Sequence, residues 1–130
     1  MHHQTVWDDI NTGVHDAISQ GLDQLDEGDL TNRSDAALNN LPVVGGQQPT
    51  TALLLRRYQT QLQSELCAGG QPRTSFDDVV DEVRELTRAV VVTLDTSEGI
   101  SIENAVLMAL ILRRRGLASF CAQPAFTPGV

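Results

Sequence analysis

The segment AVLMALIL, from Ala105 to Leu112, is apolar on every side of the helix that its spacing predicts. A helix without a polar face has to be covered by other parts of the chain, so this segment constrains the whole fold. Ser101 stands at the position of a helix N-cap, and an arginine triplet precedes Gly116. We therefore predict a helix from Ile102 to Arg115 and expect it to be the central, buried element.

Two amphipathic segments precede it and are expected to cover it. Apolar residues recur at spacings of three and four from Val6 to Leu25, with Thr5 in the position of an N-cap. A second apolar stripe begins after Thr50 and runs to Leu66, and the glycines at 69 and 70 are expected to end that helix.

A further helix is predicted to open at Ser75 in a capping-box-like arrangement with Asp78. The run Ala89 to Leu94 is rich in β-branched residues, but it continues the helical period and has no second strand to pair with, so we predict it to be helical. The sequence therefore predicts an all-α fold, a small irregular four-helix bundle.

Residues 26–49 are rich in Gly, Pro, Asn, Asp and Ser, which predicts a long connection between the first two helices. Within it, Ser34 is a candidate N-cap for one or two helical turns that reach Leu38. A connection of this length is expected to be either partly ordered or functionally exposed. Residues 1–4 and 122–130 are expected to be loose ends. At 130 residues, the chain 1–130 is expected to form one helical domain.

The charge is unevenly distributed along the chain. The chain contains seventeen acidic residues, nine arginines and no lysine, for a net charge of −8. Residues 1–35 contain eight of the acidic residues and a single arginine, Arg33. An acidic surface repels phosphate and anionic lipid, so nucleic acid is an unlikely partner. No apolar stretch approaches the roughly 20 residues of a membrane span, and no secretory leader is present, so we expect no membrane partner.

The two cysteines, Cys67 and Cys121, are expected to be reduced, partly buried thiols. A lone pair of cysteines in a chain without a recognisable leader is more typical of a reducing compartment than of a disulfide framework. This interpretation predicts a cytoplasmic protein.

Two charged clusters are candidate binding sites. Arg113, Arg114 and Arg115, with Arg56 and Arg57, could contact phosphate, but arginines in the last turn of a helix commonly interact with its carbonyl end. Asp78, Glu82 and Glu85 share a helix face and could bind a divalent cation, yet no second helix offers matching ligands. We expect a solvated face with local pairs to Arg84 and Arg88, and neither a metal nor another cofactor.

No phosphate loop, CxxC pair, HExxH or GxSxG motif is present. The leading hypothesis is therefore a non-enzymatic helical protein–protein interaction module: an adaptor, a chaperone-like protein or a small regulator, with a second copy of the chain, as in a homodimer, among the candidate partners. The alternatives are a nucleic-acid-linked regulator using the five arginines and a metal-assisted hydrolase on the carboxylates. The candidate interface comprises Trp7, Ile10, Val14, Arg113, Arg114 and Arg115.

Overall fold

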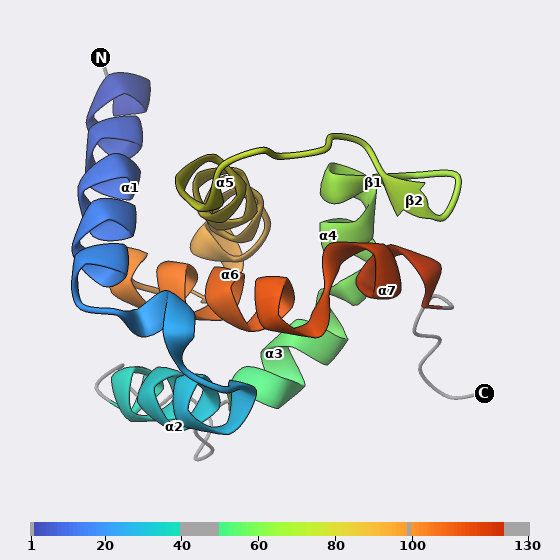
Figure 1. The fold of residues 1–130 in the computed structure, drawn as a ribbon. Coiled ribbons are helices and arrows are strands. Elements are labelled where there is room, and N and C mark those ends of the chain that lie inside the picture. Colours follow the sequence, from blue (N-terminus) through green and yellow to red (C-terminus); the bar gives the residue numbers. More distant parts are fainter. Residues whose placement is uncertain (1, 40–49, 99, 124–130) are drawn as a thin grey trace.

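A computed structural model describes residues 2–39, 50–98 and 100–123, and the described chain is mainly helical (Figure 1). In chain order the elements are α1 (His2–Ser19), the 3-10 helix η1 (Leu22–Gln24), α2 (Glu27–Leu38), α3 (Thr51–Arg57), α4 (Gln59–Leu66), β1 (Cys67–Ala68), β2 (Gln71–Pro72), α5 (Val79–Glu98), α6 (Ile102–Arg115) and α7 (Leu117–Ala122). Within the described ranges the sheet is limited to the antiparallel pairing of β1 with β2. The all-α class is thus confirmed.

Helix α6 is the central element of this fold. It crosses the middle of the molecule, with α1 on one side, α5 above it, α2 and α3 below, and α4 and α7 at the other side (Figure 1). Every residue from Asn104 to Leu112 is buried. The hydroxyl of Ser101 accepts the Asn104 N–H at 3.1 Å, which caps the helix as predicted. The prediction of a buried helix from Ile102 to Arg115 is confirmed.

Helix α5 is the second long element of the core and packs against α6, α1 and α4. It is helical through residues 89–94, as predicted, but it begins at Val79 rather than near Ser75. The Asp78 carboxylate accepts the Val80 N–H at 2.8 Å and so satisfies one of the first-turn donors. No helix of the described residues is long and apolar enough to span a bilayer.

The first helix differs from its prediction at both ends. It begins at His2, so Thr5 lies inside the helix instead of capping it, and residues 2–4 are not a loose end. It ends at Ser19 because Gly21 adopts a left-handed φ of 77°, which turns the chain into η1. The predicted extension to Leu25 is therefore wrong, although Leu25 still packs on the core.

The predicted connection 26–49 contains a helix. Asp26 caps α2 by accepting the Asp29 N–H at 2.8 Å, and Ser34 lies within the helix rather than at its start. Leu30, Ser34 and Leu38 are buried at spacings of four, on the face that meets α6. The rest of the predicted connection, residues 40–49, lies outside the described residues.

The expected four-helix arrangement is not confirmed. Thr50 caps the second predicted helix, but Tyr58 divides it into α3 and α4, and α4 ends at Leu66. The glycines at 69 and 70, with φ of 60° and 81°, form the turn between β1 and β2 instead of a helix stop. Of the expected loose end 122–130, residue 122 is the last residue of α7, and residues 124–130 lie outside the described ranges.

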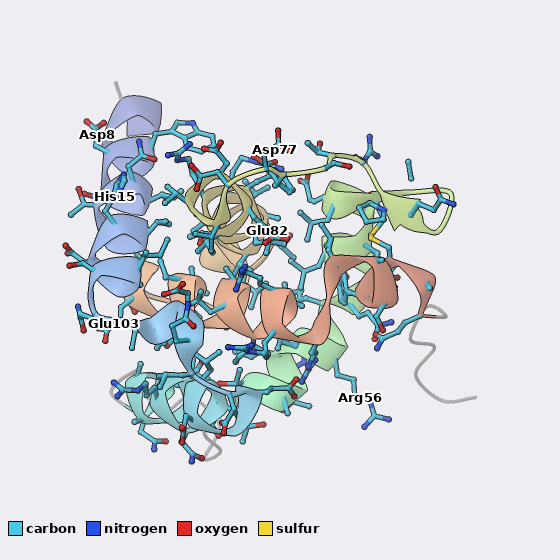
Figure 2. The ribbon with its side chains drawn as sticks, in the orientation of Figure 1. Asp8, His15, Arg56, Asp77, Glu82 and Glu103 are labelled. Carbon is cyan, nitrogen blue, oxygen red and sulfur yellow. A yellow bond between two sulfur atoms is a disulfide. The ribbon has the colours of Figure 1, made fainter. Side chains whose placement is uncertain are left out.

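Cys67 and Cys121 form a disulfide that joins β1 to α7 (Figure 2). Their Cα atoms are 5.6 Å apart, within the usual range for a disulfide, and both residues are buried. The Gln63 amide adds a second tie by donating to the carbonyls of Phe120 and Gln123 at 2.9 and 3.0 Å. The prediction of two reduced thiols is wrong, and it can no longer support a cytoplasmic location, because disulfides persist mainly in oxidising compartments.

Candidate functional site

A groove of about 330 Å³ lies where the C-terminal half of α1 meets α2 and the start of α6. This volume is at the lower end of the range for ligand pockets. We call it the α1–α2–α6 groove; its apolar lining is Gly13, Ala17, Leu22, Val106 and Leu107, and its polar lining is Asp16, Gln20, Arg33 and Glu103. Figure 2 shows Glu103 at the end of α6 that lies beside the last turns of α1.

Gly13 allows the two helices beside the groove to approach closely. A Cβ at this position would lie 3.1 Å from Ile102 Cγ2 and 3.4 Å from Val106 Cγ2. In the sequence Gly13 only weakens the helix, by up to about 1 kcal/mol relative to alanine. In the fold its missing side chain sets the distance between α1 and α6, and hence the shape of the groove.

The charged groups of the groove have no ion-pair partner in the described part of the chain. The side chains of Asp16, Glu103 and Arg33 make no hydrogen bond or ion pair within the described part of the chain, and all three are exposed. Two carboxylates against one guanidinium leave the lining with a net charge of −1. Because Asp16 and Gln20 lie at the C-terminal end of α1, the helix dipole adds negative potential there.

The outer surface of α1 extends this negative potential toward the N-terminus. Asp8 and Asp9 are exposed and have no ion-pair partner among the described residues, and Trp7 next to them is 38% exposed. Asp8 and His15 are labelled along this helix in Figure 2. We call Asp8, Asp9 and Asp16 the α1 acidic surface; Trp7 borders it next to Asp8, on the opposite side of the helix from Asp16.

The predicted interface residues of α1 are separated by the fold. Ile10 and Val14 are 1% and 0% exposed and belong to the hydrophobic core. They cannot meet a partner without unfolding, so Trp7 is the part of that prediction that remains accessible. The reason is helical periodicity, which places Ile10 and Val14 on the inner stripe of α1 and Trp7 near its edge.

The arginine triplet fastens α6 to its neighbours. Arg113 Nε lies 2.9 Å from Glu82 Oε1 on α5, and Arg115 Nε lies 3.2 Å from a Glu27 oxygen on α2. Arg114 donates to the carbonyls of residues 23 and 25 at the end of η1. The triplet therefore binds other elements, rather than simply facing the carbonyl end of its own helix. Any phosphate would compete with carboxylates at two of these arginines.

Arg56 and Arg57 lie in the last turn of α3, a different element from the triplet. Both are exposed, and Figure 2 shows Arg56 projecting away from the body of the molecule. The predicted basic cluster is thus divided between two surface positions of α3 and three arginines that hold helices together.

The carboxylates at the start of α5 pair with arginines of α5 and α6. Glu82 pairs with Arg113, and Glu85 Oε1 accepts from Arg88 Nε at 2.7 Å. That hydrogen bond raises the pKa of the Arg88 guanidinium above its usual value. Asp78 caps its own helix.

In the described ranges no three Asp, Glu, His or Cys side chains gather as a metal site would require. The expected local pairs are present: Arg84 binds Asp81 at 2.9 Å.

A buried polar cluster joins α2, α3 and α6. The Ser34 hydroxyl lies 2.6 Å from the Thr51 hydroxyl and accepts from the Asn104 amide nitrogen at 2.8 Å. The Thr51 N–H donates to Asp35 Oδ1 at 2.8 Å. The side-chain oxygen of Asn104 is buried and has no hydrogen-bond partner among the residues that the structure describes. Sequence reasoning missed both this cluster and the groove; the signal available for the cluster was the placement of Ser34 midway between Leu30 and Leu38.

Comparison of the chain with protein-family models, with curated proteins and with solved structures gives no match.

Proposed function

We propose that this protein is a non-enzymatic interaction module that binds a basic protein segment on the α1 acidic surface and the adjoining α1–α2–α6 groove. The observation that carries the proposal is that these carboxylates have no cationic partner among the described residues, although α6, whose first turns line the groove, carries three arginines in its last turn. Those arginines pair with other groups. The surface is thus left negative, with Trp7 along one edge and the groove along the other.

A basic partner is favoured over a second copy of the chain. Complementary potentials steer association and suppress wrong partners. Two copies meeting through this surface would set carboxylates against carboxylates, and the chain carries a net charge of −8. A homodimer would therefore have to use a different surface.

Affinity capture with wild type and Trp7→Ala side by side tests the proposal. Exposed tryptophans at interfaces often contribute about 2 kcal/mol or more, so the variant should retain the partner about 30-fold less well. The matched control is Val92→Ala, since Val92 is also exposed, at 54%, but lies on α5. The proposal fails if the retained proteins are the same for both variants or carry no basic segment.

A further inference from the structure

We propose that the α1–α2–α6 groove holds one arginine or lysine side chain of the partner segment, with Asp16 and Glu103 as its counterions. The proposed function is needed only to say that this side chain comes from a partner protein. The residues that line the groove come from the structure itself.

The lining of the groove matches the two parts of such a side chain. Arginine and lysine bury an apolar stem while their charged head stays near water. The buried side chains of Ala17 and Leu107, beside Gly13, offer apolar contacts for the stem, and the exposed carboxylates of Asp16 and Glu103 offer charge for the head. The volume of about 330 Å³ suits one side chain better than a large cofactor.

The two carboxylates are not equivalent. Asp16 lies near the C-terminal end of α1, where the negative end of the helix dipole adds to the attraction for a cation. Glu103 lies in the first turn of α6, where the positive end of that dipole opposes it. Asp16 is therefore expected to contribute more to binding than Glu103.

Arg33 determines which residue can follow the bound cation. Its guanidinium shares the groove with the carboxylates and makes no ion pair in the described chain. A second cation beside the first would meet this like charge, whereas an acidic neighbour would pair with it. The groove therefore selects an arginine or lysine flanked by an acidic or neutral residue over a run of basic residues.

The test uses small blocked probes and chemical-shift mapping by NMR on the full chain. N-acetyl-arginine amide should give saturable shifts at the amides of Gly13, Ala17 and Leu107, and its neutral isostere N-acetyl-citrulline amide should not. Asp16→Asn should weaken the arginine probe about two- to five-fold, the range for an exposed charge pair, and Glu103→Gln by less. Asp77→Asn, an exposed carboxylate outside both the groove and the α1 acidic surface, is the matched control.

Arg33 is tested with paired dipeptide probes. Arg33→Gln should reduce the preference for N-acetyl-Arg-Glu amide over N-acetyl-Arg-Arg amide by about two- to five-fold. Equal binding of the arginine and citrulline probes, shifts that map away from the groove, or equal effects of Asp77→Asn and Asp16→Asn would each overturn the inference. Groove binding without any captured basic protein would refute the proposed function alone. Capture that depends on Trp7 but not on Asp16 would refute the inference alone.

Discussion

Loss of the Cys67–Cys121 bond should lower the free energy of unfolding by about 4 kcal/mol. The two cysteines are 54 residues apart in the chain. A cross-link closing a loop of that size removes about 14 cal/mol/K of conformational entropy from the denatured chain, which is about 4 kcal/mol at 25 °C. Domains of this size are typically stable by only about 5–15 kcal/mol, so the change is a large share of the total.

Urea unfolding followed by helical circular dichroism measures this effect. Wild type with and without a thiol reductant should be compared with Cys67→Ala/Cys121→Ala. At a typical urea dependence of about 2 kcal/mol per molar, the midpoint should fall by about 2 M in both reduced wild type and the double variant. The slope should also rise, because the denatured chain without its cross-link exposes more surface.

The reasoning would be refuted if the oxidised and reduced proteins unfolded at the same urea concentration. Titration of thiols in the denatured, unreduced protein supplies an independent check. It should find no free thiol, whereas two thiols per chain would mean that the bond does not form.

Three further perturbations address the core and its polar contacts. Ser34→Ala removes the acceptor of the Asn104 amide and a partner of Thr51, and should destabilise by about 1–3 kcal/mol in urea unfolding; an unchanged midpoint would contradict the cluster. Leu110→Ala in α6 should cost about 2–5 kcal/mol in thermal unfolding, and a loss no larger than that of the exposed Val92→Ala would contradict the burial of α6. Glu82→Gln should cost at most about 1 kcal/mol, and less at high salt, because its pair with Arg113 is partly exposed; a salt-independent loss would rule out the ion pair as its cause.

The elements that could be predicted from sequence are those whose local signals agree with their burial. Helix α6 has a serine cap, an apolar surface on every side and a glycine stop, and its bounds were predicted to the residue. Helix α5 remains helical through the β-branched residues of its second half, because burial of one helix face offsets their lower helix propensity. Helix α2 was missed because its inward positions are Leu30, Ser34 and Leu38, and a serine there is typical of a turn.

The disulfide and the groove could not be predicted because each depends on contacts between distant parts of the chain. A spacing of 54 residues carries no information on whether two cysteines meet, and the hairpin at Gly69 and Gly70 that helps to place Cys67 resembles a helix stop in sequence. The groove requires α1, α2 and α6 at once. Its strongest sequence signal, the acidic excess before residue 35, indicates a charge but not a shape.

The most direct test of the binding surface compares variants of two helices, α1 and α3. The measured quantity is the affinity of each variant for the captured basic partner. Removing two charges with Asp8→Asn/Asp9→Asn should weaken binding about three-fold or more, and the loss should shrink as salt is raised. Arg56→Gln/Arg57→Gln, which removes two charges from α3, should leave the affinity unchanged. Binding that survives the first pair of substitutions and fails with the second would contradict the proposed function.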